Sequence, residues 1–538
     1  MSETAKETRE RVRDAWSRKL LYNRQLREIY EYFMPYRDVT GIFGLENQSE
    51  GQNHTDRIFD ITGVNSAFRF AGRVQTQLTP VFQDFFSLEA GPLIPDGDKK
   101  NEINLAYQAV GRMVSGILSG GSFAMKAHEM YLDLFAGTGA MFIARGDEIE
   151  PCKFRTVPLP EIALDEGPYG DIWGVDWRKR YKARWLPVMW PKGEFSPELR
   201  QKIKDDGGKA ELTIHQSTMY DPEKKRFVLR CFADEDTEDA IFWEEDFRTS
   251  PWITPRFFVI SGEAYGRGLG HLGLPSVKTT NKVRELALLA AAFSVLGLWM
   301  QRNDGVFNPD MIKFEPLAMW QVGSTGGPLG PTIQRLDTPK DFDVSWHIMQ
   351  DEREQLKQAL FDDTLPPDTA AVRSATEIAE RMKRVSQDLG GVYGRLTLEI
   401  VKPIVQRVID ILEQMGKLNT NVSLDQLITR VRVVAPIAAS QQAERVGQLV
   451  NWLQMMSMLG GPQAAMMAAK VEDLFPEMGR MLGVEERFIR SNPDRQQLMQ
   501  MIGALQGASQ AAAMQGPPGE SGGPAPAPAQ QYVNGGPH

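Results

Sequence analysis

The sequence has 538 residues and a formal net charge of −9 at neutral pH, and 42% of its residues are apolar and 24% charged. A chain of this length folds into several units, and its composition excludes a wholly disordered or collagen-like protein. The negative charge disfavours a protein that grips nucleic acid over its whole surface, because such proteins neutralise phosphates with Lys and Arg. A DNA partner would therefore slide along this protein and not be held tightly.

Several classes of protein are disfavoured by what the sequence lacks. Its two cysteines, Cys152 and Cys231, lie far apart without metal-binding spacing, so neither a disulfide scaffold nor a zinc site is expected, and a reducing cytoplasm fits. The N-terminal residues are polar and charged, unlike a signal peptide. The longest apolar run, residues 286–300, is shorter than the roughly twenty residues that span a bilayer, and we interpret it as a buried helix.

Apolar residues at helical spacing mark the first part of the chain. They predict a long amphipathic helix over residues 8–33, which ends before Pro35. The same spacing predicts a second helix over residues 64–78 and a further helical stretch over residues 99–135.

The hydrophobic period changes near residue 141. Apolar runs at residues 227–232 and 256–260 predict strands. The clearest alternation is that of Trp173, Val175 and Trp177 with Gly174, Asp176 and Arg178. The middle region is therefore predicted to be a β-rich α+β unit.

Two helices with an insert between them are predicted next, over residues 277–300 and 343–361. The Gly- and Pro-rich segment between them predicts a small module at the tip of a helical hairpin. After a breaker segment at 362–369, the capping box Ser374-Ala-Thr-Glu377 starts a helix that could run to residue 415. A glycine pair at 390–391 and Pro403 predict a bend in it, and Gly416 its end.

The C-terminal part is predicted to be helical and then disordered. A short β-like run at residues 424–434 precedes a methionine-rich helical region over residues 441–505. Residues 507–538 consist mainly of Gly, Ala, Pro and Gln, which cannot bury a core.

We find no recognisable catalytic motif. The six histidines are dispersed, and the nearest candidate for a phosphate-binding loop, at residues 207–210, lacks the required spacing. The turn Gly266-Arg-Gly-Leu-Gly270 has the wrong spacing for dinucleotide binding and is interpreted as a turn before the next helix. Acidic clusters at 234–236 and 244–246 are interpreted as solvated loops. No catalytic residue, metal ligand or cofactor is assigned.

Three stretches, in this order along residues 10–416, resemble the portal (head-to-tail connector) proteins of short-tailed double-stranded DNA bacteriophages. They are Arg57-Ile-Phe-Asp-Ile-Thr62 with Gln77-Leu-Thr-Pro80 and Phe85-Phe-Ser-Leu88; Tyr265-Gly-Arg-Gly268 with Leu274-Pro and Lys278-Thr-Thr-Asn281-Lys; and Ser374-Ala-Thr-Glu377 with Arg381, Arg395-Leu and Glu399. The order of helices, β-rich unit, hairpin with insert and long bent helix supports the same resemblance.

The resemblance implies a mainly helical α+β portal fold, assembled as a ring of about twelve subunits. It divides the chain into the N-terminal helices and β-rich wing at 1–270, a two-helix stem at 277–300 and 343–361, a clip at 301–342, a tunnel loop at 362–373, a long bent wing helix at 374–416, a helical crown at 417–506 and the tail at 507–538.

The resemblance also implies a function without catalysis. The ring would form the channel at one capsid vertex of the virion, through which double-stranded DNA is packaged and ejected without sequence-specific binding. Its partners would be the terminase or packaging ATPase, tail adaptor and nozzle proteins, and the major capsid and scaffolding proteins. The chain would be made in the host cytoplasm and would need neither a membrane nor a cofactor.

Candidate functional residues follow from this assignment. The predicted tunnel-loop residues that contact DNA are Asp362, Asp363, Thr364, Leu365, Pro366, Pro367, Asp368 and Arg373. The stem charges predicted to line the channel are Lys278, Lys282, Arg284, Arg353 and Lys357. Trp320 is the candidate docking residue of the clip. Two alternatives stay open: another virion structural protein, such as a tail adaptor or an ejected internal protein, or a hydrolase whose Asp, Glu and His residues meet only in the fold.

Overall fold

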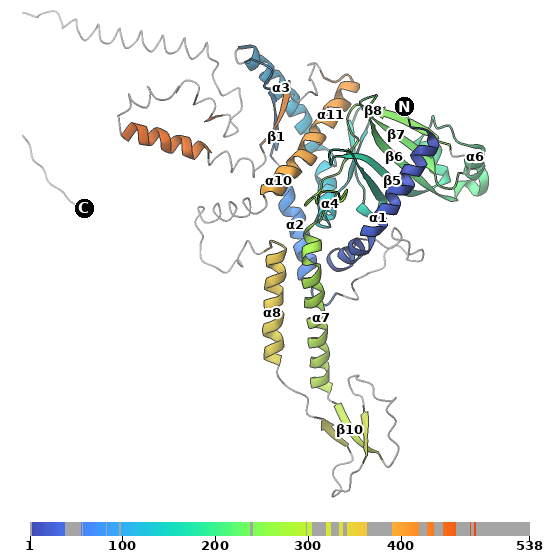
Figure 1. Ribbon diagram of the computed structural model, residues 1–538, viewed down its shortest axis with the longest axis vertical. Coiled ribbons are helices and arrows are strands. Elements are labelled where there is room, and N and C mark those ends of the chain that lie inside the picture. The colour runs from blue at the N-terminus through green and yellow to red at the C-terminus, as the bar shows by residue number, and fades with distance from the viewer. Residues whose placement is uncertain are drawn as a thin grey trace, which may run out of the picture.

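The structure is a computed structural model. It describes residues 3–37, 55, 58–81, 83–95, 98–236, 240–296, 298–303, 319–323, 333–336, 342–362, 390–418, 428–434, 445–458, 474, 478 and 479. Of these, residues 98, 99, 101, 206 and 390 and those within 294–346 are described by their backbone alone. Figure 1 shows a body of helices and sheets from which a helical hairpin projects, with a small sheet at its tip.

The first four helices build the centre of the body. Their bounds are Ala5–Phe33 for α1, Thr62–Leu78 for α2, Asp98–Gly120 for α3 and Phe123–Phe135 for α4. At the start of α1, Thr4 and Glu7 form the reciprocal hydrogen bonds of a capping box. The helical stretch predicted over 99–135 is thus two helices, and the break falls at the glycine pair 120–121, where helix propensity is low.

Aromatic side chains join these helices in one core. The ring centroids of Phe33 and Phe135 lie 5.0 Å apart, and the ring of Phe70 lies 5.5 Å from Phe135 and 5.4 Å from Phe257. All four side chains are buried, so α1, α2 and α4 pack against the segment that leads into the hairpin.

The middle region forms two antiparallel sheets, which confirms the predicted β-rich unit. The larger has the order β4-β5-β6-β7-β8, with bounds Ile162–Glu166, Ile172–Lys182, Glu211–Asp221, Arg226–Ala233 and Trp243–Phe247. The smaller has the order β3-β2-β9, with bounds Cys152–Thr156, Met141–Arg145 and Trp252–Ile253. A separate pair joins β1, Phe86–Ala90, to β13, Thr429–Val433.

Both faces of the larger sheet are covered. On one face Trp16 of α1 donates to Asp176 across 2.6 Å, and Asp176 also contacts His215 at 2.8 Å. A second apolar cluster, which includes Leu199, Leu212 and residues of the short helices between β5 and β6, covers the other face. These elements are η3, Ala183–Trp185; α5, Leu186–Met189; α6, Pro197–Lys204; and η4, Asp205–Gly208; a further turn, η2, spans Leu159–Glu161.

Two sequence predictions in this region are wrong. Residues 256–260 form no strand and make only the single bridges of Arg256 with Thr138 and of Phe258 with Arg267. The prolines at 251 and 255 flank the short strand β9, and proline cannot donate to a ladder. The acidic residues 244–246 lie in strand β8 and not in a loop, since Glu244 is placed across the sheet from Arg230, at 3.3 Å.

The hairpin consists of α7, Leu269–Leu296, and α8, Phe342–Ala359, which pack against each other (Figure 1). Its tip carries β10, Leu298–Asn303, β11, Met319–Gly323, and β12, Ile333–Leu336, with β10 in the centre. The first helix therefore begins at Leu269 and not at 277, with Pro275 inside it, and residues 298–300 belong to a strand and not to the helix. The second helix agrees with its prediction to within two residues at either end.

The long bent helix predicted before residue 416 is described from residue 390 and is irregular, as its sequence predicts. It comprises α10, Gly390–Leu396, the π-helical turn η6, Thr397–Val401, and α11, Lys402–Gln414. Pro403 has no N–H group for the carbonyl four residues back, which favours the wider π turn. Gly416 follows with a φ of +66° and ends the helix.

Little of the C-terminal region is described. Strand β13 confirms the predicted β-like run, and residues 445–458 form a helix within the predicted methionine-rich region. The capping box at 374–377 and the tail predicted to be disordered, 507–538, lie outside the described residues.

Candidate functional site where the hairpin joins the body

Asn281 of α7 ties the hairpin to the segment before α2. Its side-chain oxygen accepts hydrogen bonds from the backbone N–H groups of Phe59 and Asp60, at 2.8 and 3.0 Å. Its amide nitrogen donates to the carbonyl of Val277 at 2.9 Å, which fixes the orientation of the side chain. Asn281 and Asp60 are buried, so the bond between them satisfies a backbone N–H group that is shielded from water.

Asp60 joins the same segment to α8. Its carboxylate lies 2.6 Å from Nη2 and 2.7 Å from Nε of Arg353, and it also accepts the N–H of Thr62 at 2.9 Å. Burial alone would raise the pKa of Asp60, but the hydrogen bonds from Thr62 and the Arg353 guanidinium outweigh it and lower this pKa. Both helices of the hairpin are thus attached at one point, which we call the hairpin joint: Phe59, Asp60, Asn281 and Arg353.

Close backbone packing reinforces the hairpin joint. A Cβ atom on Gly273 of α7 would lie 2.6 Å from the side chain of Leu360, and one on Gly63 of α2 would lie 2.8 Å from Val277. The helices therefore approach more closely than a larger residue would allow.

Most of the predicted channel-lining charges are engaged within the chain. Lys278 pairs with Glu28 of α1 at 2.6 Å, and Lys282 pairs with Glu285 at 2.9 Å. Arg353 belongs to the hairpin joint, and Nη1 of Arg284 lies 3.3 Å from the sulfur of Met349. The backbone carbonyl of Lys357 accepts a bond from the N–H of Asp362. That these side chains line a channel stays a prediction.

The predicted tunnel loop and clip are described only in part. Asp362 is the one tunnel-loop candidate among the described residues, and its carboxylate is held by α2 through Ser66, Arg69 and Arg73. The backbone of Trp320 lies in β11. The other tunnel-loop candidates, Asp363, Thr364, Leu365, Pro366, Pro367, Asp368 and Arg373, lie outside the described residues.

The glycine-rich turn before α7 allows a close contact with the end of α4. A Cβ atom on Gly268 would lie 2.1 Å from the carbonyl oxygen of Phe135, and one on Gly266 would lie 2.4 Å from that of Gly137. The hydroxyl of Tyr265 accepts the N–H of Leu164 at 3.0 Å. The interpretation of this motif as a turn that leads into the next helix is confirmed.

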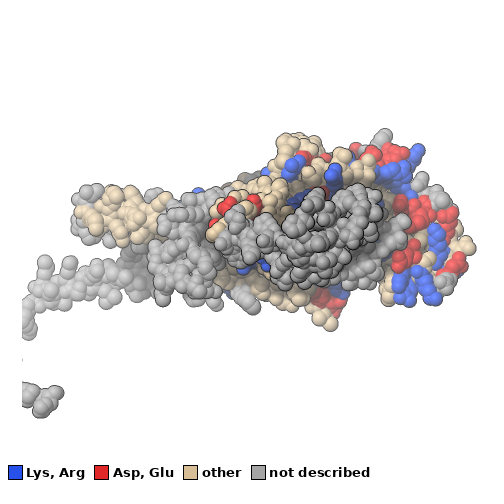
Figure 2. Space-filling view, turned by 90° about the horizontal axis from the view of Figure 1, so that it is seen from below, with Lys and Arg blue, Asp and Glu red and all other residues tan. Residues whose placement is uncertain are grey.

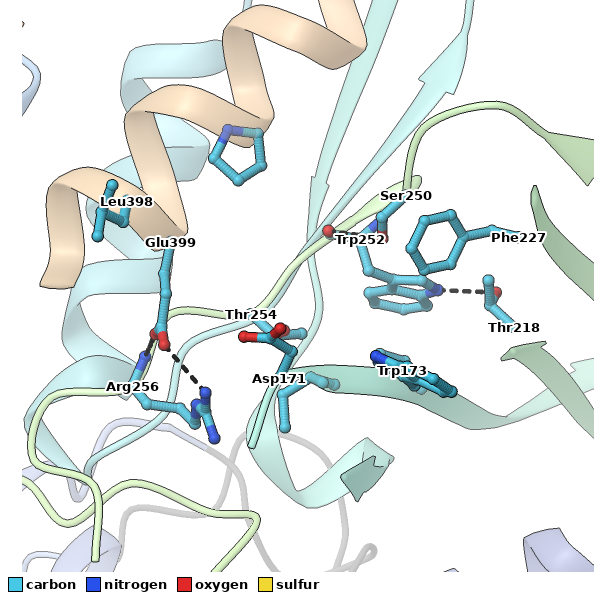
Figure 3. A pocket seen from close by; sticks show the side chains of 13 residues that line it. Asp171, Trp173, Thr218, Phe227, Ser250, Trp252, Thr254, Arg256, Leu398 and Glu399 are labelled. Atoms are coloured by element: carbon cyan, nitrogen blue, oxygen red, sulfur yellow. Dashed lines mark hydrogen bonds and ion pairs between the residues drawn. The ribbon is translucent and has the colours of Figure 1, made fainter. Parts of the chain in front are cut away.

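A pocket of about 210 Å³ lies where the π-helical turn meets the larger sheet (Figure 3). Glu399 accepts hydrogen bonds there from the backbone N–H and from Nη2 of Arg256, at 2.7 and 3.0 Å. On the opposite wall the indole of Trp252 donates to Thr218 at 3.0 Å. Glu399 and Arg256 pair with each other, so these contacts attach the π-helical turn to the segment that follows β9.

The sequence did not single out the α2 residues Ser66, Arg69 and Arg73 or the α1 residue Glu28. The spacing of the three α2 residues places them along one side of the predicted helix, which is the only signal they give. Their partners are distant in sequence, so the spacing alone could not identify them.

The described residues also bear on metal sites, membrane-spanning helices and reactive cysteines. They contain no cluster of three or more His, Cys, Asp or Glu side chains suited to a metal ion. None of the helices described is both apolar and long enough for a membrane crossing. Cys152 and Cys231 are both free and buried, and burial raises the pKa of the Cys152 thiol to about 11, which disfavours its reactive thiolate form.

The model of the family described as bacteriophage head to tail connecting proteins matches residues 5–489. The chain therefore belongs to the bacteriophage head to tail connecting protein family, which confirms the resemblance seen in the sequence.

Individual proteins agree with this assignment. The chain is 20% identical over 497 residues to the portal protein of Enterobacteria phage T3, covering 89% of this chain and 88% of that protein. It is 22% identical over 330 residues to the portal protein of Escherichia phage T7, covering 59% and 58%. Among solved structures, the neck of an empty gene transfer agent particle overlaps loosely, with a TM-score of 0.35 and 10% identity over 73% of this chain and 87% of that one.

Membership of this family fixes the general role of the chain. It is a phage portal protein, a structural component of the virion and not an enzyme. The hydrolase alternative is therefore wrong.

Proposed function

We propose that copies of this chain associate side by side through α7 into a closed ring of about twelve subunits, whose central channel conducts double-stranded DNA. The observation that carries the proposal is the apolar, exposed outer half of α7. Leu286, Leu288 and Leu289 are 54%, 48% and 43% exposed in the single chain.

These leucines cannot all be covered by the hairpin itself. Successive helix positions differ by about 100° in direction, so Leu286 and Leu289 lie on one side of α7 and Leu288 points to another side. Helix α8 packs along one side only, as Figure 1 shows. Exposed apolar side chains gathered on one helix suit a protein contact, and a contact between unlike faces of identical chains forms a ring when the rotation between neighbours closes.

The other helix of the hairpin suits a channel wall. Asp351 and Glu354 of α8 are exposed, whereas the basic residue between them, Arg353, is engaged by Asp60. Carboxylates on the wall would repel phosphates and let duplex DNA move without being held. Figure 2 shows acidic and basic side chains interspersed over the lobe that carries α6, with no continuous basic surface on that face.

The tip of the hairpin is proposed as a docking surface. A small sheet on two long helices stands clear of the body (Figure 1) and would present Trp320 first to the terminase or packaging ATPase and then to the tail adaptor and nozzle proteins. The body would contact the major capsid and scaffolding proteins. Substitution of Trp320 should weaken binding of the ATPase and of the adaptor, and unchanged binding of both would remove it from the docking surface.

Electron microscopy of the purified full chain tests the ring. A ring with a central hole wide enough for duplex DNA is expected, and particles that stay monomeric at every concentration would overturn the proposal. Deletion of Leu365–Thr369 tests the tunnel loop: rings should persist with impaired genome retention, whereas normal packaging and retention would contradict a DNA-contacting role.

A further inference from the structure

The end of α8 adopts a backbone conformation that is unusual for its sequence. After Ala359 the chain turns so that the N–H of Asp362 donates to the carbonyl of Lys357 at 2.8 Å. This turn places Phe361 at a φ of +52°, the left-handed region that glycine normally occupies at a helix end. A phenylalanine stays there only where neighbouring groups hold it.

Side chains of α2 hold Phe361 and Asp362 in this conformation. Arg73 donates from Nη1 to the carbonyl of Phe361, and its Nη2 lies 3.4 Å from the carboxylate of Asp362. Ser66 donates to the same carboxylate at 2.7 Å, and Nη1 of Arg69 lies 3.3 Å from it. We call these five residues the Asp362 anchor.

The Asp362 anchor holds two guanidinium groups against one carboxylate. The carboxylate of Asp362 is 5% exposed, whereas the side chains of Arg69 and Arg73 are 63% and 28% exposed. Burial lowers the pKa of Arg73, and the neighbouring charge of Arg69 lowers it further, although Asp362 opposes both effects. The two guanidinium groups therefore carry one more positive charge than the single Asp362 carboxylate neutralises.

Arg69 also has donors to spare. Among the described residues only its Nη1 has an assigned partner, so its Nε and Nη2 are available on a side chain that solvent reaches. A guanidinium presents its donors in a planar fork that matches two oxygens of a phosphate.

We propose that Arg69 and Arg73 form a phosphate-binding site, at which a phosphate of the DNA backbone displaces the carboxylate of Asp362 and loosens the Asp362 anchor. This inference rests on the proposed function, in which duplex DNA passes along the hairpin. Release of Arg73 would also free Phe361 from its left-handed conformation, so relief of this backbone strain favours displacement of the Asp362 carboxylate. The end of α8 is then held more firmly when the channel is empty than when it is filled.

Hydrogen–deuterium exchange on the purified full chain tests this inference. The readout is exchange at the amides of Phe361 and Asp362, with those of α4 as an internal reference. A short DNA duplex and, separately, inorganic phosphate are added at matched ionic strength. The duplex should raise exchange at the two amides several-fold without changing α4.

Variants identify the residues responsible. Arg69→Gln should abolish the response, and Arg69→Lys, which keeps the charge but loses the fork, should weaken it. Arg24→Gln, which removes an exposed arginine of α1, is the matched control and should respond like the unmodified chain.

Two outcomes would overturn the inference: no response to the duplex, or an equal response in Arg69→Gln. A weaker response of the same two amides to inorganic phosphate would support recognition of the phosphate group itself. Rings seen by electron microscopy together with either overturning outcome leave the proposed function intact. Absence of rings counts against the proposed function by itself.

Discussion

The exposed leucines of α7 give the sharpest test of subunit association. Replacing Leu286, Leu288 and Leu289 by glutamine keeps helix propensity nearly constant, because Gln and Leu are similar helix formers. Burying a whole leucine stabilises by about 1.5–3 kcal/mol, and each of these is 43–54% exposed in the single chain, so its remaining half contributes about 1 kcal/mol in a contact. The three substitutions should cost about 3 kcal/mol per contact, which weakens it about a hundredfold.

The same substitutions should leave the single chain folded. Exposed positions away from special contacts usually change the free energy of unfolding by less than about 0.5 kcal/mol. Sedimentation velocity over a range of concentrations measures the association, and thermal unfolding at low concentration measures the fold. A matched control replaces Leu20 and Leu21 of α1, which are 67% and 83% exposed but lie outside the hairpin. If the triple variant assembled at the same concentration as the unmodified chain, the reasoning would be refuted.

Three further predictions concern the fold that supports the hairpin. Asn281→Ala removes the acceptor of two backbone N–H groups, of which that of Asp60 is buried, and should lower the free energy of unfolding by about 2 kcal/mol in denaturant titration. Gly268→Ala places a Cβ atom 2.1 Å from the carbonyl of Phe135 and should cost about 3 kcal/mol or more, whereas Gly72→Ala, with nothing within 4 Å, should be neutral or stabilising. Burial raises the pKa of Asp133 to about 6, so the folded chain holds this proton more tightly than the unfolded one. Stability should therefore fall as the pH rises from about 4 to 6, and Asp133→Asn should flatten that part of the Tm profile.

Strong local signals account for what could be predicted from the sequence. Helix α1 follows from its apolar spacing, and its end follows from Pro35. The hairpin follows from two helical segments around a Gly- and Pro-rich insert. These features depend on residues that are close together in the sequence, so the sequence of a single chain is enough to predict them.

The predicted element bounds are wrong where contacts with distant parts of the chain, and not the local sequence pattern, determine the structure. The sequence predicts a helix start at residue 277, but α7 begins at Leu269, directly after the glycine turn that packs on the end of α4. Residues 298–300 continued an apolar run and were interpreted as helix, yet they pair with β11 and β12. A short apolar run has no period that distinguishes a strand from a buried helix.

The candidate site was the least predictable part. Asp362 was chosen for its place in a breaker segment, which says nothing of the three α2 side chains that hold its carboxylate. Likewise, Lys278 and Arg353 are predicted from the sequence as channel-lining charges, which says nothing of Glu28 and Asp60, whose carboxylates lie 2.6 Å from them. Pairings between residues hundreds of positions apart are set by tertiary packing and leave no periodic trace in the sequence.

The residues that resemble the family have a common structural role where the structure describes them. Asp60 and Asn281 come from two different stretches and meet in the hairpin joint, and Glu399, from the third, fastens the long bent helix to Arg256. None of these contacts lies on the exposed sides of α7 or α8. These three residues of the family-like stretches therefore fix how the hairpin and the long bent helix are attached to the body.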